Sequence, residues 1–271
     1  MHRLILFAAL AVSQWAPWIL TGLVGGPVPA VTGVAAFAAV LWWAIRRTPP
    51  QIRPTWGLSS ARPAGPLLLT GLAVGALVYL AVFSIRWWGG GGLVVEVHGD
   101  EVWLVLATGL LVAGYQAFSE EVVFRGAVFT LLVPDAPVRS AIAVSTALFV
   151  LFHAPRWREL MAGPYALHLL LAGLAFAVAY VRTGSLWFGM GLHAGWNAGA
   201  YLLREGDPAL LRLAGSLPEG WDGWSSWVGV AGNALLLLVV LALPGGRVGP
   251  GRAGLGPALA PRRRAPVTGE P

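Results

Sequence analysis

Residues 102–133 form an apolar stretch that reads VWLVLATGLLVAGYQAFSEEVVFRGAVFTLLV. A helix needs about 20 residues to cross the hydrocarbon core of a bilayer, and this stretch is longer. Its charged residues are Glu120, Glu121 and Arg125. A charged side chain at the centre of a membrane helix costs about 2.5–3.5 kcal/mol even on insertion scales. The stretch therefore predicts a transmembrane helix whose charged residues face a protein interior and have a function.

The composition of the whole chain agrees with a membrane protein. Hydrophobic residues make up 57% of the 271 residues, and charged residues make up 11%. The mean hydropathy of +0.71 does not suit a soluble surface, so the bilayer is the expected solvent. We predict an all-α fold, a polytopic membrane helix bundle of about eight transmembrane helices. The predicted spans are residues 4–24, 29–45, 66–86, 102–133, 138–153, 165–182, 185–204 and 224–244.

The first predicted span also has the features of a signal peptide, because a lone Arg precedes an apolar run. A second span follows this run at once, which favours a retained helix. We therefore expect residues 1–244 to form one transmembrane domain.

The distribution of charge predicts the orientation of the chain. Four Arg residues lie between residues 46 and 62, and an Arg cluster lies in the Gly- and Pro-rich tail, residues 245–271. Since cytoplasmic loops are enriched in Arg, we expect both termini in the cytoplasm and a disordered basic tail near anionic lipid. The Arg residues lie in short loops and the tail, so nucleic acid is not an expected partner of this chain, whose net charge is +6. Its Gly-, Ala- and Arg-rich composition favours a bacterial plasma membrane.

The charged residues of the 102–133 stretch have different predicted partners. Glu121 and Arg125 are four residues apart and lie on one helix face, in the favoured orientation for an ion pair. Glu120 points about 100° away and is available to act as a general base. The alternative is a helix that ends at the membrane interface, with hydrated acids and with the Arg125 side chain reaching back to water.

Two further segments carry polar residues in or at the end of a predicted span. His153 follows Phe149 by four residues at the end of one span, and His193 and Asn197 have the same spacing within another. An interfacial location is the alternative for His153, and helix packing is the alternative for the segment rich in small residues around His193. His168 stands alone in its span, where we expect it to pack or to hydrogen-bond to a neighbour.

Together these residues are suited to hydrolysis. Two acids, two His and an Asn on three helices can activate water and hold an oxyanion. The same set offers a second chemistry, in which Glu120, His153 and His193 bind Zn²⁺ with one position open. The chain has no Cys, no His-Glu-x-x-His and no Gly-x-Ser-x-Gly, so thiolate, zincin and serine-elbow chemistry are excluded.

The three motifs Glu-Glu-x-x-x-Arg, Phe-x-x-x-His and His-x-x-x-Asn, in that order on successive predicted helices, resemble the CPBP family of CAAX proteases and bacteriocin-processing enzymes. The resemblance covers residues 102–204. It implies a helical fold with a conical cavity and makes Glu120 the water-activating carboxylate, supported by Glu121 and Arg125. It further implies that His153 orients water or binds metal, and that His193 and Asn197 form the oxyanion site. Metal-dependent and metal-free mechanisms both remain open.

The sequence thus predicts an intramembrane endopeptidase that cleaves membrane-associated peptides or protein C-termini. Its expected partners are membrane lipid and a peptide or membrane-protein substrate. Two alternatives belong to other classes: a non-catalytic peptide-binding scaffold or bacteriocin immunity protein, and a small transporter, since intramembrane charges also serve ion pathways. The oligomeric state is left open.

Overall fold

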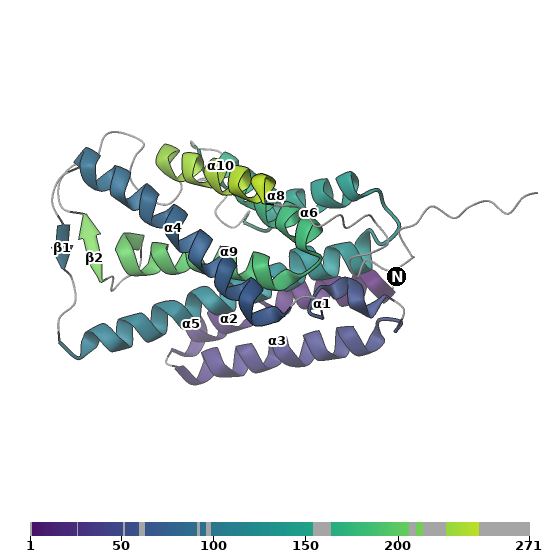
Figure 1. Cartoon of the computed structure of the whole chain (residues 1–271). Helices are drawn as coiled ribbons and strands as arrows, with labels where there is room; N and C mark the ends of the chain where they lie inside the picture. The colour runs from purple at the N-terminus through teal and green to yellow at the C-terminus, as the bar shows by residue number, and fades with distance from the viewer. Residues whose placement is uncertain are drawn as a thin grey trace, which may run out of the picture.

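The fold is known from a computed structural model of the whole chain (Figure 1). The structure describes residues 2–25, 27–50, 52–59, 63–90, 93–95, 99–153, 164–205, 210–213 and 226–243. Within these ranges the protein is predominantly α-helical, and the predicted fold class is confirmed. The predicted tail, residues 245–271, lies outside the described residues.

Four helices are long and apolar enough to cross a membrane in the described part of the chain. They are residues 30–47 of α3 (Pro27–Arg47), α4 (Ala64–Gly90), α5 (Glu101–Glu121) together with η2 (Val122–Leu132), and α8 (Tyr165–Thr183). A fifth is present if α1 (His2–Ser13) and α2 (Ala16–Val24), which are bent by 41°, form one broken span. The length and apolar composition of these helices indicate an integral membrane protein.

The expected number of about eight spans is not confirmed, although every predicted span corresponds to helix in the described residues. Besides α1 and α2, three α-helices of the described residues are shorter than 18 residues, namely α6 (Val138–Phe152), α9 (Leu186–Ala200) and α10 (Trp227–Ala242). The end of the regular α-helix has a local cause in two cases. The chain turns at His153 after α6, and α9 gives way to the π-helix η4 (Tyr201–Glu205).

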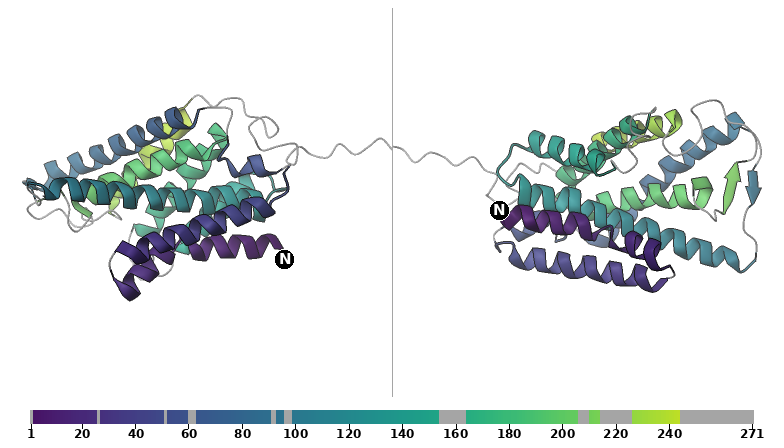
Figure 2. Two further views of the ribbon diagram at one scale, coloured as in Figure 1. Left: turned by 90° about the horizontal axis from the view of Figure 1, so that it is seen from below. Right: turned by 180° about the vertical axis from the view of Figure 1, so that it is seen from behind.

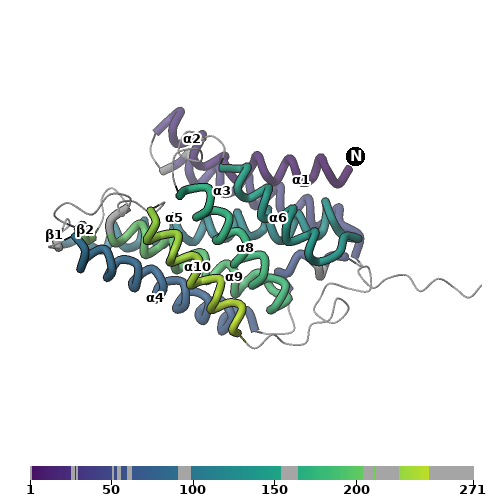
Figure 3. Tube along the Cα trace, turned by 90° about the horizontal axis from the view of Figure 1, so that it is seen from above, coloured from purple at the N-terminus to yellow at the C-terminus, as the bar shows by residue number. Residues whose placement is uncertain are grey.

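The helices are arranged around α5 and α9 (Figures 2 and 3). The N-terminal helices α1, α2 and α3 lie on one side, where α1 packs against η2. On the other side α9 packs along α4, and α10 packs on α4 and α8. The two central helices therefore have protein on both sides, as residues that cannot face lipid require.

Glycines allow α4 and α9 to approach at backbone distance. Gly71 and Gly75 of α4 face backbone atoms of α9, and Gly191 and Gly195 of α9 face backbone atoms of α4. A Cβ at any of these positions would overlap a carbonyl oxygen of the facing helix. This reciprocal small-x-x-x-small packing is a common way for membrane helices to associate. The helix-packing interpretation of the small residues therefore holds for this face of α9.

The helix that carries the charged residues changes its winding directly after them. The chain continues from α5 as the π-helix η2, and almost all of its residues are buried. π-Helical turns are rare and occur often at functional sites. The Phe124 carbonyl accepts a hydrogen bond of 2.8 Å from Ser145 Oγ of α6, which links the two elements. The sequence predicted the continuous helix but not its π-helical part.

The predicted cytoplasmic loop at residues 46–62 is packed against the protein where the structure describes it. Trp56, in the short 3-10 helix η1 (Arg53–Trp56), is 1% exposed, and its indole N–H donates to Thr48 Oγ1 at 3.2 Å. Leu186 N donates to the carbonyl of Gly57, whose φ of 70° and close contact with Tyr180 leave no room for a side chain. This segment therefore supports η2 and the start of α9.

Two short strands are an addition to the predicted all-α fold. β1 (Leu93–Val95) pairs antiparallel with β2 (Leu211–Leu213), with Leu93 opposite Leu213 (Figure 1). The pair joins the segment before α5 to the segment after η4.

Candidate active site

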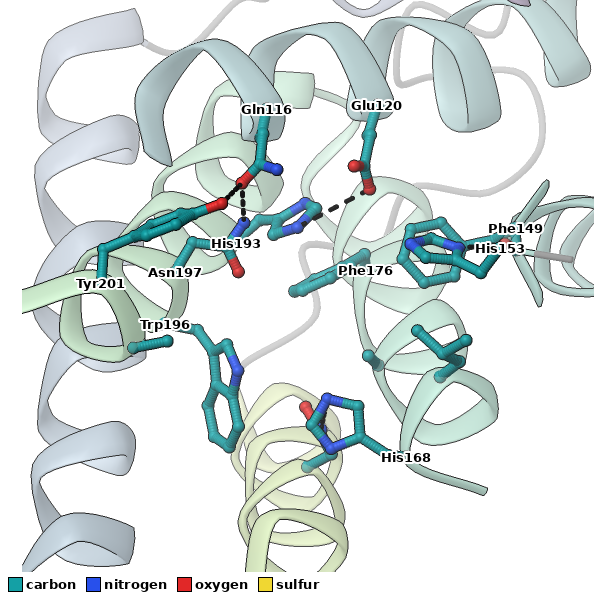
Figure 4. Close-up of a pocket in the computed structure, with 14 residues that line it drawn as sticks. Gln116, Glu120, Phe149, His153, His168, Phe176, His193, Trp196, Asn197 and Tyr201 are labelled. Carbon is teal, nitrogen blue, oxygen red and sulfur yellow. Dashed lines mark hydrogen bonds and ion pairs between the residues drawn. The ribbon is translucent and has the colours of Figure 1, made fainter. Parts of the chain in front are cut away.

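A cavity of about 390 Å³ opens between the central helices (Figure 4). Residues of α5, α6, α8, α9 and α10 line it, together with the first residue of η4 and with His153 directly after α6. Its polar lining consists of Gln116, Glu120, His153, His168, His193, Asn197, Tyr201 and Asn233, among apolar and aromatic side chains. The cavity thus brings together four of the predicted site residues, Glu120, His153, His193 and Asn197.

The remaining two predicted residues form a buried ion pair behind the cavity. Arg125 Nη1 donates to Glu121 Oε1 at 2.9 Å, and both side chains are 0% exposed. The structure therefore contains the ion pair that the four-residue spacing predicts. Neither residue is at a hydrated interface, so the alternative of a helix end with exposed acids does not hold for this pair.

Arg125 has further contacts that hold the guanidinium in place. Its Nη2 donates to the Gly173 carbonyl at 3.0 Å, and its Cζ lies 4.7 Å from the ring centre of Phe149 and 5.3 Å from that of Phe176. An arginine in this position gains both planar hydrogen bonding and cation–π attraction. The guanidinium therefore joins α8 and α6 to the helix that carries the acids.

His193 is oriented by Glu121. Its Nδ1 lies 3.2 Å from Glu121 Oε1, and the ring stacks on Phe176 with a centre distance of 4.4 Å and an interplanar angle of 17°. Because a carboxylate only accepts hydrogen bonds, Nδ1 carries the proton and Nε2 points to the other side. Among the described contacts Glu121 thus supports His193, whereas the family resemblance led us to expect support for Glu120.

Glu120 is the acid that reaches the cavity. Its carboxylate is 17% exposed, and Oε2 lies 3.9 Å from His193 Nε2 (Figure 4). This distance is longer than a direct hydrogen bond. The two groups therefore face each other across a gap, and both are accessible to a molecule in the cavity.

His153 has a defined tautomer because its Nδ1 lies 2.7 Å from the Phe149 carbonyl oxygen. A carbonyl can only accept, so Nδ1 donates and Nε2 keeps its lone pair. His153 lines the cavity at the end of α6 and is partly exposed. Its Nε2 can accept a hydrogen bond from a water molecule or a substrate N–H.

Asn197 belongs to a small amide cluster with two residues that the sequence analysis did not identify. Asn197 Nδ2 donates to Gln116 Oε1 at 3.4 Å, and the Tyr201 hydroxyl donates to the same oxygen at 3.0 Å (Figure 4). Gln116 is four residues before Glu120, and Tyr201 is four residues after Asn197, so helical spacing is the signal that could have found them.

His168 lies deeper in the same cavity. Asn233 Nδ2 is 3.0 Å from its Nδ1, and the Trp196 ring centre is 5.9 Å away. The expectation that His168 packs and hydrogen-bonds to a neighbour therefore agrees with the structure.

The structure does not support the Zn²⁺ alternative. No group of three or more His, Cys, Asp or Glu side chains in the described ranges is placed to hold a metal ion. The predicted set of Glu120, His153 and His193 is thus not arranged as a ligand set, and the interpretation as a metalloprotease is not supported. We derive no step through a metal.

The fold and site are those of a helical membrane protein with a carboxylate, two imidazoles and amides around an internal cavity. Residues 101–199 match the family model described as Type II CAAX prenyl endopeptidase Rce1-like. Residues 101–199 are therefore similar to this endopeptidase family, and the match supports the resemblance to the CPBP family. All six predicted site residues lie within this range. Searches of curated proteins and of solved structures found no match.

Proposed function

We propose that this protein is an intramembrane endopeptidase that hydrolyses peptide bonds of membrane-associated peptides or protein C-termini. The family match supports a peptidase. The observation that carries the proposal is the partly exposed Glu120 carboxylate, 3.9 Å from an imidazole whose far nitrogen is bound by a buried acid. The Glu120 carboxylate can therefore act as a base on one side of the space in which the reaction takes place. The His193 imidazole can form a hydrogen bond on the other side.

The proposed reaction uses Glu120 as the general base. Glu120 takes a proton from water, and the water oxygen bonds to the scissile carbonyl carbon to give a tetrahedral oxyanion. His153 Nε2 accepts a hydrogen bond from a substrate N–H and so aligns the scissile carbonyl with this water. The C–N bond then breaks, and the proton passes from Glu120 to the leaving nitrogen. The products are a carboxylic acid and an amine.

In the proposed transition state, His193 and Asn197 bind the oxyanion. The imidazolium form of His193 can donate from Nε2 while Nδ1–H stays on Glu121. Asn197 has a second amide N–H besides the one on Gln116. Preorganised donors of this kind act strongly in a site without bulk water, where each contributes about 10²–10³-fold in rate.

The cavity supports a peptide substrate more than a small ion. Its volume of about 390 Å³ is in the range of sites that bind small ligands or a few side chains, and its walls are both aromatic and polar. We propose that the substrate enters from the lipid, in a bacterial plasma membrane, with both termini of the enzyme in the cytoplasm.

The test is cleavage of a mixed library of membrane-tethered peptides by purified protein in liposomes, read by mass spectrometry. Glu120→Gln should abolish the new peptide termini while leaving the unfolding temperature unchanged. Glu101→Gln is the matched control, since Glu101 is an exposed acid at the start of the same helix. Normal cleavage by Glu120→Gln would sink the assignment. Peptide binding without cleavage would favour a scaffold, and ion or solute flux would favour a transporter.

A further inference from the structure

A second, much smaller chamber adjoins the cavity on the other side of Glu120. Its volume is about 20 Å³, and its polar lining consists of Gln14, Gln116, Ser119, Glu120 and His153. Gln116, Glu120 and His153 line both spaces. The Glu120 carboxylate therefore lies where the large cavity of about 390 Å³ meets a chamber of about 20 Å³.

The chamber is closed on one side by the break between α1 and α2. α1 ends at Ser13, α2 begins at Ala16, and Pro17 has no N–H to continue the helical hydrogen bonding across the break. The Tyr115 hydroxyl donates to the Gln14 carbonyl at 3.0 Å and so fixes the backbone of the break to α5. The side chain of Gln14 is thereby directed toward α5 and the chamber.

Gln14 carries an acceptor that its surroundings do not use. The residue is 4% exposed, and its Oε1 has no hydrogen-bond partner in the described part of the chain. A buried polar atom without a partner is destabilising, so such atoms in folded proteins usually bind an ordered water or a ligand. Gln14 also lines the chamber that contains the Glu120 carboxylate.

The size and polarity of the chamber suit one water molecule. A buried water needs space of at least 10–15 Å³, about the volume of one probe sphere, and two to four polar partners. The chamber provides that space and five polar residues, with Trp15, Phe124 and Phe152 as apolar walls.

We propose that this chamber holds the water consumed in the reaction and that Gln14 is one of its ligands. The proposal rests on the endopeptidase function given above. One O–H of the water donates to Glu120 and the other to Gln14 Oε1. Both protons are then directed away from the main cavity, and an oxygen lone pair faces the scissile carbonyl. Substrate and water thus occupy adjoining spaces that meet at Glu120, and a bound peptide does not displace the nucleophile.

Gln14→Met tests the proposal because methionine keeps the length of the side chain and removes the amide. Its kcat should fall about 10- to 100-fold, the effect of losing one hydrogen bond to a reacting group, while KM stays within about twofold. Leu10→Met is the matched control, since Leu10 is a fully buried residue of α1, four residues before Gln14, and lines neither space. Its kcat should remain that of the wild type.

The outcomes separate this proposal from the proposed function. If Glu120→Gln is inactive but Gln14→Met and Leu10→Met have the same kcat, the water site is wrong and the peptidase stands. A raised KM in Gln14→Met would also overturn the proposal, because Gln14 would then contact the substrate. Should Gln14→Met fail to fold, Gln14→Asn must show a kcat loss without a KM change. If the wild-type protein cleaves no peptide, the result contradicts both the proposed peptidase function and the proposed water site.

Discussion

His193 and Glu121 are joined by a contact of 3.2 Å between Nδ1 and Oε1, and the Nε2 atom of the same ring faces Glu120 at 3.9 Å. The two neighbouring acids therefore act on one imidazole from different sides. Glu121 is fully buried and fixes the ring, while Glu120 is partly exposed and available to substrate. In the proposed mechanism these adjacent glutamates therefore have separate roles, Glu121 a structural one and Glu120 a chemical one.

Glu121→Gln should unfold at a lower temperature than Glu120→Gln. The change leaves the Arg125 guanidinium buried without its counter-ion, and breaking a buried ion pair in this way costs about 3–5 kcal/mol. Thermal unfolding in detergent measures the difference. The double variant Glu121→Gln with Arg125→Met should recover part of the loss. Equal unfolding temperatures for the two single variants would contradict the assignment.

Tyr201→Phe should lower kcat by a few fold and leave KM nearly unchanged. The substitution removes the hydroxyl that binds Gln116 Oε1, so Gln116 holds the Asn197 amide less firmly. Asn197→Ala removes a proposed oxyanion donor and should cost about 10²–10³-fold in kcat. Steady-state cleavage of one identified peptide measures both. The idea fails if Tyr201→Phe is more damaging than Asn197→Ala.

Gly191→Val should destabilise the protein strongly, because a Cβ at this position overlaps the Leu68 carbonyl and forces α9 away from α4. Gly114→Val in α5 is the control, since no atom lies within 4 Å of the position that its Cβ would occupy. Thermal unfolding and yield of monodisperse protein should separate the two variants. A Gly191→Val protein as stable as the control would show that α4 and α9 are not held at backbone distance.

Chelation should leave peptide cleavage intact. The described residues contain no group of three ligands for a metal, so the proposed reaction depends on Glu120 and the imidazoles alone. Cleavage is measured before and after dialysis against EDTA and o-phenanthroline. Loss of activity that Zn²⁺ restores would reverse this prediction and return Glu120, His153 and His193 to the role of ligands.

The orientation can be tested with single cysteines, because the chain contains none. Pro50→Cys lies before α4 and Asp100→Cys lies between the end of α4 and the start of α5, and both positions are exposed. With both termini in the cytoplasm, an impermeant maleimide should label Asp100→Cys in intact cells and Pro50→Cys only after lysis. The reverse pattern would invert the proposed topology.

The sequence predicted those parts of the site that depend on local geometry. The Glu121–Arg125 pair follows from residues on one helical turn, and the inward position of the charges follows from the cost of exposing them to lipid. The contact of Glu121 with His193 joins residues 72 positions apart and depends on how α5 and α9 pack, which no local pattern states. Gln116 was missed because a neutral amide in a membrane helix is a weaker signal than a charge.

The fold was predicted to a similar extent. The apolar runs predicted the helices, since the length and composition of a run determine whether it can cross a bilayer as a helix. The π-helical winding of η2 was not predictable, because the same residues satisfy an α-helical pattern. Strands β1 and β2 have three residues each and are too short for an alternating pattern to be recognised. The number of spans was also uncertain, since α6, α9 and α10 have 15 or 16 residues, fewer than the 20 or so that cross a bilayer.

The glycine contacts between α4 and α9 also affect how the site can admit a substrate. Two helices in contact at their backbones have no intervening side chains that could change rotamer and let them slide, so we expect α4 and α9 to move as a single rigid body. His193 and Asn197, carried by that body, form the stationary wall of the cavity. Widening for a peptide then depends on the opposite wall, where α6 and α8 are joined through the guanidinium of Arg125.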